Sequence, residues 1–377
     1  MSDRAPIVEL LRSAPLLDGH NDLVWELRKA RERGEDPDVS VAAPRLHTDL
    51  PRVEAGGLRA QFWSAYVPSD LVDPHAAVTM TLEQVDAIHR LVRRHPDRLE
   101  LARTADDVER IAASGRVASM IGIEGGHSIG GSLGALGALA TLGAGYLTLT
   151  HNDDTTWADS ATGGRRHGGL TAFGEEVVRE LNRLGVLVDL SHTSEDTMRQ
   201  AIEVSQAPVI FSHSNARALC DVGRNVPDDV IALVGRTGGT ICVTFVPWFL
   251  TREGAAANAA EWEEARRLRA EHPDDPEAVR AAIERYEEEH PTPPSSVKDV
   301  ADHVDHVRRV AGIDHVGIGS DFDGSPGMPV GLEDVSRYPA LFEELGRRGY
   351  SDDDLQKVAG RNVLRVMREA ERVAGAA

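Results

Sequence analysis

The stretch LLDGHNDLVW, residues 16–25, places three polar side chains directly after an apolar run. Asp18, His20 and Asp22 are spaced two residues apart in it. Residues at this spacing point to the same face of an extended strand, so one imidazole and two carboxylates would be directed toward one place. The stretch therefore predicts a buried strand whose carboxyl end carries a group of polar side chains.

Seven more short apolar runs occur along the 377-residue chain. They are rich in Val, Ile and Leu, as is typical of strands that are buried on both faces. The runs are AQFWSAYVP (60–68), ASMIGIEGG (118–126), YLTLTHN (146–152), VLVDLSHTS (186–194), PVIFSHSN (208–215), GGTICVTFVP (238–247) and HVGIGSDFDG (315–324). Amphipathic segments with helical periodicity lie between most of them, for example 171–185, 194–205 and 297–312. Strands that alternate with helices predict an α/β fold, either a (β/α)8 barrel or an open doubly wound sheet.

The positions of the polar residues favour the barrel. Polar groups follow at least six of the runs, and a barrel gathers the carboxyl ends of all its strands at one mouth. An open sheet would concentrate them near a single switch point, and no G-x-G-x-x-G or phosphate-binding loop follows any run. We therefore expect a (β/α)8 TIM barrel, with residues 1–377 forming a single domain with helical insertions.

Two connections are longer than a barrel needs. One is residues 23–59 after the first strand, and the other is residues 251–297 between the seventh and eighth strands, which is charged and helical in pattern. Long connections usually form lids or interfaces, and a solvated helical insertion is the alternative for the second one.

Composition excludes several classes of function. The chain has 41 basic and 61 acidic residues, a formal charge of −20, which argues against a nucleic-acid partner. It shows no long apolar run, signal peptide or lipid-anchor tail, so no membrane association is expected. Only two cysteines occur, Cys220 and Cys242. A disulfide framework is therefore not expected, and the expected location is the cytoplasm.

Five residues with metal-binding side chains follow four of the predicted strands: His20, Asp22, Glu124, His192 and His213. Any one of these histidines alone would more often be structural, but imidazoles and carboxylates together suit Zn²⁺. Five ligands are more than one tetrahedral zinc needs, and two ions bridged by one carboxylate would use them all. We predict two Zn²⁺ per chain, one held by His20 and Asp22 and one by His192 and His213, bridged by Glu124 and a hydroxide. Such a pair, about 3.5–4 Å apart, can activate the hydroxide and polarise a carbonyl group.

Other polar residues complete the predicted site. Asp321, at the end of the eighth strand, could take a proton from the water and give it to a leaving amine. His151 could donate a hydrogen bond to an oxyanion, and Arg224 could pair with a substrate carboxylate, although it could also be a loop-bracing arginine. Asp18 is expected to orient its neighbours rather than to bind metal, and Asp323 to shape a turn.

The ordered motifs DGHND, GIEGGHSI, LTLTHND, DLSHTS, FSHSNARAL and GIGSDFDG resemble the membrane (renal) dipeptidases, peptidase family M19 of the amidohydrolase superfamily, of which this chain would be a bacterial member. The resemblance extends from residue 16 to about residue 367. It implies that the zinc ligands are His20, Asp22, Glu124, His192 and His213. It also implies that His151 supports the oxyanion, that Arg224 binds the substrate carboxylate and that Asp321 is the acid–base residue. Mammalian members are secreted, disulfide-bonded and lipid-anchored, and those signals are absent from this sequence, so their location is not implied.

The predicted function is that of a binuclear zinc dipeptidase that hydrolyses dipeptides, including L-Xaa-D-Xaa dipeptides, by attack of a metal-bridging hydroxide on the peptide carbonyl. The alternatives are another amidohydrolase-type hydrolase acting on a lactone or cyclic amide, and a non-catalytic metal- or peptide-binding protein. Arg224 distinguishes the dipeptidase from the lactone or cyclic-amide hydrolase, because a substrate without a carboxylate would not need this arginine. A small dipeptide is the expected partner, and a homodimer is a further expectation.

Overall fold

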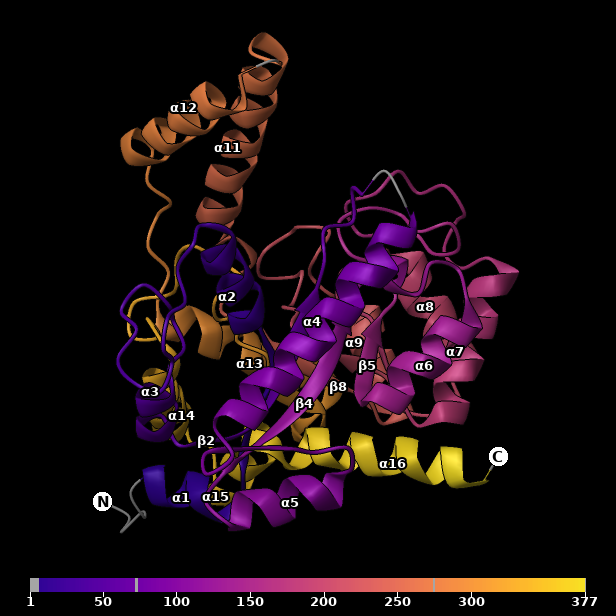
Figure 1. Ribbon diagram of the computed structural model, residues 1–377. Coiled ribbons are helices and arrows are strands. Elements are labelled where there is room, and N and C mark those ends of the chain that lie inside the picture. The colour runs from indigo at the N-terminus through magenta and orange to yellow at the C-terminus, as the bar shows by residue number, and fades with distance from the viewer. Residues whose placement is uncertain (1–6, 72–73, 274, 377) are drawn as a thin grey trace.

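The computed structural model describes residues 7–71, 74–273 and 275–376, and it confirms the (β/α)8 barrel (Figure 1). Eight parallel strands are hydrogen-bonded in the order β2-β1-β9-β8-β7-β6-β5-β4, and β4 pairs back with β2 to close the barrel. The eight strands are β1 (Leu16–Asn21), β2 (Leu58–Tyr66), β4 (Val117–Glu124), β5 (Ala144–Thr148), β6 (Leu187–Asp189), β7 (Ile210–Phe211), β8 (Thr240–Val243) and β9 (Val316–Ile318). Each lies within or overlaps one of the predicted apolar runs.

A ninth strand, β3 (Leu99–Leu101), was not predicted. It pairs with β4 at Val117–Ser119, next to the position where β5 joins β4 from Ile121 onward. With only three residues, LEL, it is too short to show a strand period, so the sequence pattern gave no signal for it.

The helices cover the outside of the barrel and, in part, its ends (Figure 1). They are α1 (Ile7–Ser13), α2 (Leu23–Glu32), α3 (Leu50–Ala55), α4 (Pro74–Arg94), α5 (Ala105–Ala113), α6 (Leu133–Leu142), α7 (Ala172–Leu184), α8 (Glu195–Val204), α9 (Asp228–Thr237), α10 (Pro247–Leu250), α11 (Arg252–Glu271), α12 (Pro276–Glu289), α13 (Val297–Ala311), α14 (Tyr338–Arg347), α15 (Asp352–Gln356) and α16 (Asn362–Ala376). The three example helices of the prediction are α7, α8 and α13. Each begins after a residue whose hydroxyl accepts a hydrogen bond from the first turn, namely Thr171, Ser194 and Ser296.

Apolar side chains fill the end of the barrel that lies opposite the carboxyl ends of the strands. Leu17, Phe62, Ile210 and Cys242 are 0% exposed and form one cluster inside the barrel, which continues onto α16. This helix crosses the end of the barrel that lies away from α11 and α12 (Figure 1). Because these side chains are buried and pack together, they help to fix the positions of the strands.

The two long connections differ from each other. In the first, α2 follows β1 after a single residue, and a loop of residues 33–49 leads to α3. The second consists mainly of α11 and α12, which project from the barrel mouth and are here called the helical arm (Figure 1). Within the described ranges, no helix combines the length and apolarity needed to span a bilayer.

Candidate active site

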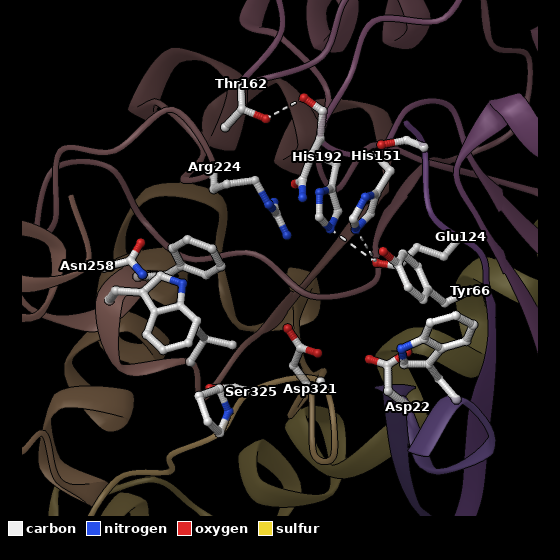
Figure 2. A pocket seen from close by; sticks show the side chains of 18 of the residues that line it. Asp22, Tyr66, Glu124, His151, Thr162, His192, Arg224, Asn258, Asp321 and Ser325 are labelled. Carbon is white, nitrogen blue, oxygen red and sulfur yellow. Dashed lines mark hydrogen bonds and ion pairs between the residues drawn. The ribbon is translucent and has the colours of Figure 1, made fainter. Parts of the chain in front are cut away.

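The eight residues singled out from the sequence come together at the carboxyl ends of the strands. A cavity of about 970 Å³ opens there, lined among others by Asp22, Glu124, His151, His192, Arg224 and Asp321 (Figure 2). The remaining two, His20 and His213, are 0% and 1% exposed and lie against Glu124. The structure therefore brings together residues that are as much as 301 positions apart in the sequence, from His20 to Asp321.

Glu124 lies at the centre of this group, at the end of β4. Its Oε1 is 3.2 Å from His192 Nε2 and 3.6 Å from His213 Nε2. Its Oε2 is 3.5 Å from His20 Nε2 and accepts a hydrogen bond of 3.0 Å from Ser64 Oγ. The two oxygens of one carboxylate thus face different histidines, which is the arrangement that a bridging ligand requires.

The donor atoms fit metal binding. His192 Nε2 and His213 Nε2 are 3.0 Å apart, and burial holds the pKa of both imidazoles well below the usual value, so both are neutral. On the other side of Glu124, Asp22 Oδ2 is 3.2 Å from His20 Nε2, and Asp22 Oδ1 is buried without a hydrogen-bond partner in the described part of the chain. Neutral imidazole nitrogens and carboxylate oxygens that converge in this way are the ligands that zinc prefers.

Hydrogen bonds behind the histidines fix their orientation. His20 Nδ1 shares a hydrogen bond of 2.8 Å with the Tyr146 hydroxyl from β5. His213 Nδ1 shares one of 2.8 Å with Ser212 Oγ, which donates over 2.7 Å to the buried carboxylate of Asp189. In metal sites such bonds hold the ligand rings with one nitrogen toward the ion. Sequence reasoning missed these supports, although Asp189 sits inside the apolar run VLVDLSH, the same kind of signal that drew attention to Asp18.

Asp18 has the supporting role that the sequence predicts. Its Oδ1 accepts hydrogen bonds from the backbone N–H of His20 (3.1 Å) and of Ser320 (2.8 Å). Its Oδ2 accepts from Ser320 Oγ (2.5 Å) and from the Tyr338 hydroxyl. The carboxylate therefore ties the end of β1 to the end of β9, which are the segments that carry His20 and Asp321.

Two of the site residues have strained backbones. His192 and Asp321 have φ values of 67° and 66°, in the left-handed region that costs a non-glycine residue on the order of 1–3 kcal/mol. Hydrogen bonds to their backbones hold them there. The His192 carbonyl accepts from Ala161 N at 2.7 Å and from Thr150 Oγ1 at 3.0 Å, and Asp321 N donates to the His20 carbonyl at 3.2 Å. Strain that is held by its surroundings at a cavity is typical of functional residues.

Asp321 and His151 lie beside the metal-ligand group. Burial raises the pKa of Asp321 to about 8; the charge of His20 opposes this rise, and the carboxylates of Asp22 and Glu124 add to it. Burial lowers the pKa of His151 to about 4, and its Nε2 is 3.7 Å from Glu124 Oε1. Both residues are close enough to the others to join a metal-binding group, so their assignment as acid–base and oxyanion-binding residues stays a prediction.

Arg224 carries buried hydrogen-bond donors that are not used. It is 5% exposed, Nη2 donates to the His213 carbonyl at 3.4 Å, and Nε and Nη1 have no partner among the described residues. Its guanidinium carbon lies 5.1 Å from the Phe249 ring centre, and burial lowers its pKa to about 10, which leaves it charged at neutral pH. In Figure 2 Arg224 and Glu124 lie on either side of His192 and His151, and Asp321 lies below them. A buried cation with free donors is suited to bind an anionic group of a ligand.

Asp323 does more than shape its own turn. Its Oδ1 accepts from His47 N at 2.6 Å, and its own N–H donates to His47 Nδ1 at 3.0 Å. These bonds fasten the loop of residues 33–49 to the end of β9. The next residue, Gly324, passes so close to the Asp321 and Asp22 carboxylates that a Cβ atom there would collide with both.

Comparison with known proteins places the chain in a family. The sequence profile described as "Membrane dipeptidase (Peptidase family M19)" matches residues 4–377. The chain belongs to this family. It is therefore a metal-dependent dipeptidase by family, as the resemblance of its motifs predicts.

Individual relatives agree with the family assignment. Dipeptidase 3 of Mus musculus is 42% identical over 376 residues, which is 98% of this chain and 67% of the mouse protein. The probable dipeptidase PvdM from Pseudomonas aeruginosa has a similar structure, with a TM-score of 0.84 and 26% identity over 98% of both chains. A metallopeptidase from Rhodobacter sphaeroides, bound to a phosphinate mimic of the dipeptide L-Ala-D-Ala, has a TM-score of 0.78 and 25% identity, covering 95% of this chain and 99% of that one.

Proposed function

We propose that this M19 protein is a binuclear zinc dipeptidase and that its substrates include L-Xaa-D-Xaa dipeptides. The observation that carries the proposal is the position of Glu124, whose two carboxylate oxygens face separate histidines, His192 and His213 on one side and His20 on the other.

The ligands divide into two sets around this carboxylate. His20 and Asp22 would hold one ion, His192 and His213 the other, and Glu124 would bind both. When bound, such a pair of ions supplies an activated water and polarises the scissile carbonyl group.

Arg224 would hold the substrate by its C-terminal carboxylate. Its Nη2 lies only 3.4 Å from the carbonyl oxygen of His213, one of the candidate ligands. Arg224 and the candidate ligands Glu124 and His192 line the same cavity, so a C-terminal carboxylate bound by Arg224 would place the adjacent peptide bond beside the metal-ligand group. Arg224 therefore favours dipeptides over longer peptides, and a forked guanidinium–carboxylate pair would orient the peptide bond.

Asp321 would transfer the protons, and His151 would stabilise the negative charge that develops on the substrate. Asp321 would accept a proton from the attacking water and give it to the departing amine. Its Oδ1 lies 4.0 Å from His20 Nε2, which places the carboxyl group beside the candidate metal ligands where these protons are transferred. His151 would donate a hydrogen bond from its ring to the oxyanion of the tetrahedral intermediate.

The choice of L-Xaa-D-Xaa dipeptides rests on the relative from Rhodobacter sphaeroides, whose ligand mimics L-Ala-D-Ala. A cavity of about 970 Å³ is at the large end of the range of about 300–1,000 Å³ for ligand sites, so a dipeptide fits it by size.

The test combines metal analysis with a substrate panel. Zinc per chain is measured by mass spectrometry on the purified protein, and hydrolysis is followed for L-Ala-L-Ala, L-Ala-D-Ala, D-Ala-L-Ala and the amide of L-Ala-D-Ala. We expect two zinc ions per chain, hydrolysis of L-Ala-D-Ala, and poor hydrolysis of the amide because Arg224 has no carboxylate to bind. Fewer than about one tightly bound zinc, or no turnover of any dipeptide by the zinc-loaded protein, would overturn the proposal.

A further inference from the structure

The helical arm supplies one wall of the active-site cavity. Asn258, Trp262 and Arg266 of α11 all line it. They are spaced four residues apart, so they share one face of the helix, and successive members are about 6 Å apart along its axis. The proposed mechanism gives these residues no role.

Trp262 is the unusual member of this wall. It is 52% exposed, whereas Ala265 and Leu268 on the same helix are 6% and 7% exposed. Nowhere in the described ranges does another residue form a ring pair or a hydrogen bond with its indole. A large aromatic side chain that lines a cavity and is half exposed offers apolar area that a ligand can cover.

The position of Arg224 determines which part of the substrate meets this wall. The Arg224 guanidinium lies on the ring of Phe249 in α10, and α10 leads into α11 through Thr251, whose hydroxyl accepts a hydrogen bond of 3.0 Å from Gly254 N. In Figure 2, Asn258 lies on the same side of the cavity as Arg224.

The opposite side of the cavity holds Asp22, Glu124 and Tyr66 (Figure 2). With its carboxylate on Arg224, the C-terminal residue of a dipeptide would lie nearer to α11 than the N-terminal residue does. The N-terminal residue lies beyond the scissile bond, toward Glu124 and Tyr66.

We propose that Trp262 is a specificity-determining residue whose indole packs against the side chain of the dipeptide's C-terminal residue. The enzyme then prefers large apolar or aromatic C-terminal residues over glycine and alanine. This inference rests on the proposed function, in which Arg224 binds the C-terminal carboxylate.

The test measures kcat/KM for two series of dipeptides with W262A, W262F and a control, Y286A. Tyr286 is an aromatic residue of the same arm, but it stacks on His290, with ring centres 4.3 Å apart, and does not line the cavity. The first series is Ala-Xaa with Gly, Ala, Leu or Phe at Xaa, in the C-terminal chirality that the wild type hydrolyses better. The second series is Xaa-Ala with the same residues at the N-terminal position.

For W262A we expect kcat/KM for Ala-Phe to fall roughly 10-fold and that for Ala-Gly to change less than about 2-fold, because glycine has no side chain to contact the indole. W262F should keep most of the preference. The order of substrates in the Xaa-Ala series should stay as in the wild type, and Y286A should behave as the wild type in both series.

Three results for W262A would overturn the inference. The first is an equal loss of kcat/KM for all dipeptides, and the second is a change confined to the Xaa-Ala series. The third is a fall in the molecular mass measured by light scattering, which would make Trp262 part of an interface between copies. A failure of the proposed function looks different, since the wild-type protein would then hydrolyse no member of either series.

Discussion

The strand-end cluster and the helical arm meet at the same cavity, but they are built differently. The eight candidate residues of the cluster are at most 9% exposed. The arm is charged and mostly exposed, and Arg267, for example, pairs on its surface with Glu264 and Glu271. Ion pairs of this exposed kind contribute little to stability, whereas each buried polar group of the cluster requires partners.

The two regions differ in how readily their residues can be substituted. Bonds from neighbouring strands hold parts of the cluster: Tyr146 bonds to His20, and Asp18 joins β1, which carries His20, to β9, so a substitution there disturbs many groups at once. Among the residues that the structure describes, none bonds to the Trp262 side chain, so it can be replaced without moving its neighbours. We infer that the barrel fixes the chemistry and that the arm adjusts which dipeptides are accepted.

The largest effect is expected for Glu124→Gln. The amide has lost the charge that lets one carboxylate serve two cations, so bound zinc should fall and kcat/KM should drop at least about 1,000-fold. The matched control is Glu284→Gln on the arm, where the carboxylate is 64% exposed. If Glu124→Gln kept its full zinc content and the wild-type rate, the strand-end cluster would be no more sensitive to substitution than the helical arm.

Asp321→Asn should lower kcat about 100- to 1,000-fold because the amide cannot carry the proton from the water to the amine. Unlike Glu124→Gln, it should leave the zinc content near that of the wild type. Parallel measurement of zinc and of kcat separates the two roles. If zinc is lost along with activity, Asp321 is a metal ligand, which its distance of 4.0 Å from His20 Nε2 would allow.

Arg224→Ala should lower kcat/KM for dipeptides about 10- to 100-fold through loss of a charge-assisted pair with the carboxylate. The decisive comparison uses dipeptide amides. The wild type should lose activity when the substrate carboxylate is amidated, and the variant should be almost insensitive to that change. Arg266→Ala is the control from the arm, since it also removes an arginine from the wall of the cavity. Equal sensitivity of both variants to amidation would contradict the role of Arg224.

Asp189→Asn should weaken zinc binding about 10-fold, because Asp189 acts on the metal only through Ser212 and His213. Competition with a chelator measures this affinity. Asp196→Asn on α8, whose carboxylate is 56% exposed, should leave it unchanged. No loss of affinity in Asp189→Asn would mean that the ring of His213 is oriented by packing alone.

The smallest effect is expected for Leu268→Ala in the arm. It should change the free energy of global unfolding by less than about 1 kcal/mol, because a projecting element opens locally before the barrel unfolds. Leu187→Ala in β6, where the side chain is 3% exposed, should cost about 2–5 kcal/mol. Denaturant titration of both variants checks this. Similar losses would show that the arm and the barrel unfold as one unit.

Much of this protein could be predicted from local patterns. At least six of the apolar runs are followed by a polar residue within a few positions, as in the runs that contain His192 and His213. Parallel strands in a barrel must bring their carboxyl ends to one mouth, so the convergence of these residues follows from the strand count and needs no coordinates.

Other features could not be predicted in this way because they depend on distances between segments remote in sequence. The bond of Tyr146 to His20 and the support of His213 by Asp189 arise from the register of neighbouring strands. The strand β3 depends on the free edge of β4, which no local period reveals.

The barrel, the family and the eight candidate residues could therefore be predicted from local patterns, because strand periodicity and the residue after each strand are local properties. Three features could not: the two oxygens of Glu124 face different histidines, Arg224 is buried with donors that no described residue uses, and Trp262 of α11 lines the cavity. These facts depend on how side chains orient and where an inserted helix packs, and both are set by contacts across the whole fold.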